Sequence, residues 1–213
     1  MFKNNFKTNI ILFLVICILY FFLSYAISKF FYTTEILNNS LRFLNLKNGT
    51  SYFEISKFKF LNFIFIPFQL IVKIIFVYLC LKIGLLLNQK SARNVDILKS
   101  ILLSEFVYII EGIMRMYLIS KNKFSSIQEI NSFSPFSIYY IFNFNSTHPY
   151  IYIPLSIISI FKLIYIFILS YFLSKIVNLK LNYSIIFVFK TYGLGLLFWI
   201  IILTYIAISV INK

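Results

Sequence analysis

The chain has 213 residues, of which 61% are hydrophobic and 12% are charged, and its 20 Lys and Arg against 6 Asp and Glu give a net charge of +14. This composition excludes a single soluble domain, in which about a quarter of the residues would be charged. It indicates an integral membrane protein. The basic residues are scattered through loops and helix ends, a pattern that predicts the lipid bilayer as a partner and no nucleic acid.

Five apolar segments each approach the ~20 residues that a helix needs to cross a bilayer core. We therefore predict an all-α, polytopic membrane protein, with one membrane domain over residues 1–213 that forms a bundle of five transmembrane helices. Strands of a membrane barrel would be about ten residues long and would alternate in polarity, which these segments do not. The predicted spans are residues 9–27, 66–87, 95–118, 151–174 and 185–209.

The first span has a second interpretation, as a cleaved signal peptide. Lys3 and Lys7 precede an apolar run that ends in Ser-Tyr-Ala at residues 24–26, which fits a signal-peptidase site. The run continues to Phe31 and is longer than most signal-peptide cores, so we favour a retained helix. Cleavage would leave four helices.

The orientation follows weakly from charge, because the two sides would carry equal numbers of basic residues in a five-span arrangement. The lysines before the first span favour a cytoplasmic N-terminus. The connections over residues 28–65 and 120–150 would then be extracytoplasmic. Their Phe and Tyr residues are mixed with Lys, Ser and Asn, which is typical of segments that lie partly at the head-group level.

The third predicted span carries Glu105, Glu111 and Arg115, and ionisable groups are costly in hydrocarbon. At ~100° per residue, Ser100 and Ser104 share one polar face with Glu111 and Arg115. Glu111 and Arg115 are four residues apart, the spacing at which a carboxylate and a guanidinium meet on a helix. We expect these two side chains to neutralise each other.

Lysines on the other spans complete a predicted intramembrane charge network: Lys73, Lys162 and Lys190. Lys73 lies at the depth of Glu111, and we expect these two to compensate each other. Lys162, near the middle of its span, is expected to compensate Glu105. Lys190 and Arg115 would extend toward the interfaces. The network could hold the bundle together, line a polar cavity or proton pathway, or contact lipid head groups.

Small side chains on three spans predict helix-packing surfaces, because they let backbones approach closely and form interhelical hydrogen bonds. These residues are Ser100, Ser104, Ser156, Ser159, Ser170, Gly193 and Gly195.

Enzyme motifs are missing from the sequence. The single histidine, His148, lies in a loop, and no His or Cys cluster has the spacing of a zinc site. The sequence also contains no GxSxG, phosphate-binding loop or dinucleotide-binding turn. We therefore expect no catalytic residue, no metal site and no cofactor.

Five short motifs from Lys73 onward occur in a recognisable order: "CLKIGLLL", "ILLSEFVYIIEGI", "SFSPFSIYYIF", "PLSIISIFKLIYIFILSYFL" and "YGLGLLFWI". This order resembles the Yip family, the Rab-interacting five-span membrane proteins. It is most similar to the uncharacterised bacterial branch, whose members carry a similar Pro-Leu-Ser segment. The Asp-Leu-Tyr-Gly-Pro signature of eukaryotic members is missing. The resemblance implies a non-enzymatic, five-helix protein of the bacterial plasma membrane with a cytoplasmic N-terminus.

Two function classes remain open. The first is a scaffold or accessory subunit that binds another membrane protein or shapes lipid. The second is a small transporter or channel subunit that uses the intramembrane polar stripe. The second class would require a homo-oligomer, because five helices contain no obvious inverted repeat.

Overall fold

The computed structural model describes residues 6–31, 52–122, 124, 129–130, 133–142 and 149–211. Regular structure in these residues is helical, which confirms the all-α prediction for this part of the chain. The elements are α1 (Phe6–Phe31), α3 (Tyr52–Leu87), α4 (Asn94–Lys121), α6 (Ile138–Ile141), α7 (Pro149–Ile157), α8 (Ile160–Val177), α9 (Leu181–Val188), the π-helix η1 (Phe189–Gly193) and α10 (Leu194–Ile211).

Four helical segments in the described part of the chain are long and apolar enough to cross a membrane: Phe6–Phe31, Phe65–Leu87, Ile160–Val177 and Leu181–Ile206. They correspond to the first, second, fourth and fifth predicted spans. The third predicted span lies within α4, which has 28 residues and contains Asp96, Lys99, Glu105, Glu111 and Arg115. Length and composition therefore support four of the five predicted spans. Whether the third predicted span also crosses a membrane depends on where α4 lies in the bundle.

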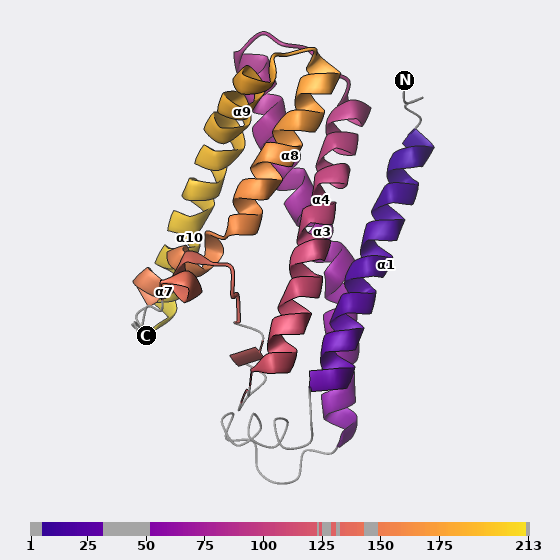
Figure 1. Cartoon of the computed structure of the whole chain (residues 1–213), viewed down its shortest axis with the longest axis vertical. Coiled ribbons are helices and arrows are strands. Elements are labelled where there is room, and N and C mark those ends of the chain that lie inside the picture. The colour runs from indigo at the N-terminus through magenta and orange to yellow at the C-terminus, as the bar shows by residue number, and fades with distance from the viewer. Residues whose placement is uncertain are drawn as a thin grey trace.

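Figure 1 shows a bundle in which successive long helices run in opposite directions, and the N and C labels lie at opposite ends. The centre is occupied by α4, which packs against α1, α3 and α8. It buries polar side chains as well as apolar ones. The buried polar and charged residues of α4 are Asp96, Lys99, Ser100, Ser104 and Glu105. These three helices cover the face of α4 that carries the buried polar groups, whereas Ile110, Ile113, Met114 and Tyr117 of α4 are exposed. The covered face explains why α4 can be the most polar of the long helices.

The helices α1 and α4 run parallel and in register. Near their N-terminal ends, Asn9 Nδ2 donates to the carbonyl of Val95 at 2.8 Å. Further along, Tyr20 Oη approaches Glu105 Oε2 at 3.5 Å. Beyond that, a Cβ built on Gly112 would lie 2.8 Å from Leu23 Cδ1. The two helices therefore stay side by side from Asn9 to Leu23, about 21 Å along α1.

The fourth predicted span, residues 151–174, is wrong as a continuous helix. The chain leaves the helix at Ile158 and Ser159, between α7 and α8, and α7 packs against α10. A short antiparallel bridge forms at this break: Ile138 N donates to Ile158 O, and Ile160 N donates to Phe136 O, both at 3.0 Å. The paired loop satisfies the backbone groups that the helix would otherwise leave exposed to lipid. Ser159 then caps α8 by accepting from Lys162 N at 3.3 Å.

The predicted connection over residues 28–65 is also partly helical. α1 continues to Phe31, and α3 begins at Tyr52, so Pro67 lies inside α3 instead of at its start. Residues 32–51 lie outside the described residues, as does His148. The second connection, 120–150, contains the short helix α6 and the start of α7. The side of the membrane on which the connections lie stays a prediction.

The predicted packing residues take different positions in the structure. Ser100, Ser104, Ser159 and Ser170 are buried, whereas Ser156 is half-buried and donates to Ile153 O within α7. The carbonyl of Ser170 accepts an interhelical hydrogen bond from Ser184 Oγ at 2.9 Å. A Cβ on Gly195 would lie 2.6 Å from Cys80 Sγ of α3, but one on Gly193 would meet only the Phe189 ring, at 3.7 Å. Gly195 therefore marks a close helix approach, and Gly193 does not.

The closest approach among the described glycines was not predicted, and it lies between α3 and η1. A Cβ on Gly84 would overlap Cγ2 of Thr191 and would lie 3.1 Å from Cζ of Phe187.

We predict that Gly84→Ala lowers the thermal unfolding midpoint of the detergent-solubilised chain, because overpacking costs about 1–3 kcal/mol. Gly193→Ala is the matched control, and the gain in helix propensity should leave its midpoint equal or higher. Equal losses in the two variants would contradict this packing.

Candidate functional site

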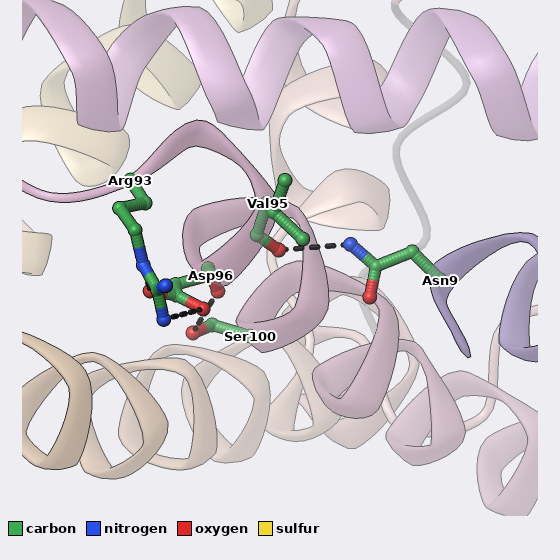
Figure 2. Close-up of polar contacts among 5 residues, drawn as sticks. All are labelled: Asn9, Arg93, Val95, Asp96 and Ser100. Atoms are coloured by element: carbon green, nitrogen blue, oxygen red, sulfur yellow. Dashed lines mark hydrogen bonds and ion pairs between the residues drawn. The ribbon is translucent and has the colours of Figure 1, made fainter. Parts of the chain in front are cut away.

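Polar contacts fix the first turn of α4, as Figure 2 shows. Arg93 Nε donates to Asp96 Oδ2 at 2.8 Å, and Asn9 of α1 holds the carbonyl of Val95. From α3, Lys82 Nζ donates to Asn94 Oδ1 at 2.8 Å. An acidic side chain in the first turn also complements the helix dipole. These contacts fix the start of α4 relative to α1 and α3, and they thereby set the depth of the charged residues further along α4.

The centre of the bundle contains an ion pair between α3 and α4. Lys73 Nζ lies 2.7 Å from Glu105 Oε2, and the Glu105 side chain is fully buried. About a third of the Lys73 side chain is exposed, on the sides where it lines two cavities. The short charge-assisted hydrogen bond compensates a carboxylate that would otherwise be isolated from water.

Tyrosines from α1, α4 and α8 surround this pair, and one from η1 packs behind them. Lys73 Nζ lies 3.3 Å from the ring centroid of Tyr108 and 5.5 Å from that of Tyr165, both within the range of cation–π attraction. Tyr165 in turn lies 5.7 Å, between ring centroids, from Tyr192 of the π-helix η1. Tyr20 of α1 reaches Glu105 from the other side. The ammonium group is therefore stabilised by a carboxylate and by aromatic faces together.

The cluster is not fully hydrogen-bonded. Three buried oxygens have no hydrogen-bond partner among the described residues: Glu105 Oε1, Tyr108 Oη and Tyr165 Oη. A buried polar atom without a partner costs about 1–3 kcal/mol. The cluster is therefore held in place by the surrounding helices, and it is not a strong source of stability by itself.

A polar cavity lies on one side of the ion pair, between α1, α3, α4 and the loop residues 133–135; we name it the α1–α4 cavity. Its volume is about 760 Å³. Lys73 and Tyr108 form its inner end, and Glu111 and Arg115 lie along α4 toward the loop. Gln69 and Ser24 add polar groups. Such a cavity can hold water or a polar ligand at membrane depth.

A second, more apolar cavity of about 450 Å³ lies on the other side of Lys73 and Tyr108, between α3, the α7–α8 junction and η1–α10; we name it the α3–α10 cavity. Lys73 and Lys162 are its charged lining residues. The remaining walls are mostly aromatic and aliphatic: Phe68, Val72, Phe76, Ile157, Tyr192, Leu196, Trp199 and Leu203. Lys73 and Tyr108 therefore separate a polar cavity from an apolar one.

The structure brings the predicted network residues together in different pairs. Lys73 binds Glu105, so the predicted pairs Lys73–Glu111 and Lys162–Glu105 are wrong as direct contacts. Glu111 forms no ion pair among the described residues, and it lines the α1–α4 cavity together with Lys73 and Arg115. The sequence-based depths were wrong because α8 starts at Ile160, which moves Lys162 from the middle of a span to its first turn.

The two remaining basic residues lie at the edges of the network. Arg115 Nη2 donates to the carbonyl of Ile130 at 2.6 Å and so ties α4 to the loop. The predicted Glu111–Arg115 ion pair is not among the ion pairs formed within the described part of the chain, although both side chains line the α1–α4 cavity. Lys190 is exposed on η1 and lines neither cavity.

Sequence reasoning missed the tyrosines at 20, 165 and 192 and the contact made by Asn9. Tyr20 is 85 residues from Glu105 in the chain, and Asn9 is 86 residues from Val95. No local pattern encodes such distances. A weak signal existed for Asn9, because a polar side chain inside an apolar span usually faces another helix.

Comparisons of the chain with protein-family models, with curated proteins and with solved structures gave no match. Among the described residues, no group of three or more His, Cys, Asp and Glu side chains could hold a metal ion.

The ion pair predicts unequal effects for the two glutamates of α4. Glu105→Gln should lower the free energy of unfolding by about 3 kcal/mol or more, because it leaves the Lys73 ammonium buried without its carboxylate. Glu111→Gln should cost less, because Glu111 is half-buried beside a cavity. Detergent-driven unfolding followed by circular dichroism measures both values.

The double variant Lys73→Met with Glu105→Leu supplies the control for that measurement. Replacing both members of a buried ion pair by apolar side chains of similar size is often neutral, so this variant should regain most of the loss. Equal losses for Glu105→Gln and Glu111→Gln, or a double variant as unstable as Glu105→Gln, would contradict the account.

Proposed function

We propose that this chain is a non-enzymatic, five-span membrane protein that acts as a scaffold or accessory subunit of a membrane complex. The observation that carries the proposal is the closed centre of the bundle. Glu105, its partner Lys73 and the tyrosines around them block the inner end of the α1–α4 cavity. A fixed centre of this kind supports a structural role.

The register of α1 and α4 supports five spans. α1 is long and apolar enough to cross a membrane, and α4 accompanies it from Asn9 beside Val95 to Leu23 beside Gly112. The matching stretch of α4 rises by about 26 Å, close to the ~30 Å of a bilayer core. Two parallel helices at the same level reach the same depth. We infer that α4 crosses the membrane inside the bundle, where α1, α3 and α8 shield its charges from lipid.

Five spans place the two ends of the chain on opposite sides. The lysines before α1, Lys3 and Lys7, favour a cytoplasmic N-terminus. The resemblance of the C-terminal two-thirds of the chain to the bacterial branch of the Yip family points to the same orientation, to the plasma membrane and to a non-enzymatic role.

A second candidate function is a small transporter or channel subunit. The observation that favours it is the α1–α4 cavity of about 760 Å³, which contains Glu111 and Arg115 and leads to Lys73. Transport would require Tyr108 and the Lys73–Glu105 pair to move aside, so that the two cavities join. This would be a conformational change at the centre of the bundle.

Cross-linking in native membranes, followed by mild extraction and affinity purification of the tagged full chain, tests the first candidate. We expect one membrane protein at a constant molar ratio to the chain, whether the tag is at the N-terminus or at the C-terminus. An unrelated multi-pass protein with the same tag controls for nonspecific capture.

Two outcomes would contradict the scaffold proposal. A homo-oligomer with a water-filled centre would instead support the transporter, and a monomer without any partner would support neither candidate. Glu105→Gln sharpens the test, because loosening the bundle should reduce recovery of a partner that binds the assembled fold. Glu111→Gln should leave recovery unchanged for a scaffold.

A further inference from the structure

The α3–α10 cavity opens on the lipid-facing surface of the bundle. Phe68 and Val72 of α3 line one side of it, Trp199 of α10 lines the other, and all three are exposed large hydrophobic side chains. Tyr192 and Tyr108 form its floor, since both are largely covered by neighbouring helices. An apolar groove with these walls accommodates an acyl chain.

One cation in this cavity has no direct counter-charge. Lys73 binds Glu105, whereas no carboxylate of the described residues lies within ion-pair distance of Lys162 Nζ. Glu111 lines the α1–α4 cavity and not this one. The described lining of the α3–α10 cavity contains two lysines and no carboxylate. Charge complementarity therefore favours a negatively charged occupant.

The depth of Lys162 indicates which anion can reach it. Lys162 is the third residue of α8, which as an 18-residue span is about 27 Å long and nearly matches the bilayer core. Its four-carbon side chain can carry the ammonium group from the first turn of α8 toward the head-group region, where an anionic group can reach it. Tryptophan prefers the same region, and Trp199 lies on the same cavity.

We propose that the α3–α10 cavity is a binding site for an anionic membrane lipid. The phosphate of the lipid binds Lys162, and one acyl chain lies in the groove between Phe68 and Val72 on α3 and Trp199 on α10. The π-helix η1 contributes by turning Tyr192 into the floor of the groove.

Trp199 is the only tryptophan in the chain and it lines this cavity, so lipid that is enriched in the cavity changes its fluorescence. The full chain is reconstituted into phosphatidylcholine vesicles, and lipids with brominated acyl chains are added as quenchers. Brominated phosphatidylglycerol is the anionic probe, and brominated phosphatidylcholine at equal mole fractions is the zwitterionic one. We expect quenching by the anionic lipid to correspond to about fivefold enrichment near Trp199 relative to the zwitterionic lipid. One lysine near an anionic head group has an effect of about this size.

Lysine variants assign this preference to one side chain. Lys162→Gln should abolish it, whereas Lys162→Arg, which keeps the positive charge, should retain it and shows that the site tolerates substitution. Lys190→Gln is the matched control, because Lys190 is exposed on the continuous helix that carries Trp199 but lines neither cavity. Equal quenching by the two lipids, a preference that survives Lys162→Gln, or an equal loss in Lys190→Gln would overturn the proposal.

Discussion

A carboxylate inside a membrane must be compensated, and the arrangement of this bundle follows from how Glu105 is compensated. Its partner is Lys73, 2.7 Å away on α3, and the pair is enclosed by tyrosines from α1, α4 and α8. Such a pair is stable only when both charges are hydrogen-bonded and shielded from lipid. The helices α1, α3 and α8 must therefore close around α4. The two cavities lie on either side of the same pair, and Lys73 and Tyr108 separate them.

The interior position of α4 connects its composition with its depth. Helices that face lipid are selected for apolar surface, whereas a helix enclosed by others can carry serines and ionisable side chains. Hydropathy therefore identifies α1, α3, α8 and the α9–η1–α10 helix as apolar enough to cross a membrane, and it does not include α4. The position of α4 is evident from its contacts, since Asn9 and Leu23 of α1 meet Val95 and Gly112 at matching levels.

The sequence predicted the helical class, four of the span positions and the presence of Lys73 and Glu105 in the interior, because hydrophobic length and the cost of ionisable groups are local properties. The pairing was not predictable in the same way. Exchanging Lys73 between Glu105 and Glu111 requires a shift of less than two turns, about 9 Å along α4. Errors of about three residues in the predicted ends of both α3 and α4 add up to such a shift. The break at Ile158 and Ser159 was also hidden, because it depends on pairing with Phe136 and Ile138, 20 to 24 residues earlier. That break places Lys162 in the first turn of α8, where it forms no direct ion pair with Glu105.

The central claim is that α4 crosses the membrane as the enclosed fifth helix. It is tested most directly by locating both ends of the chain with reporters, fused one at a time, that are active on only one side of the membrane. Five spans predict that the ends of the chain lie on opposite sides, with the N-terminal reporter in the cytoplasm. Both reporters on the same side would mean an even number of crossings, and that result would contradict the account.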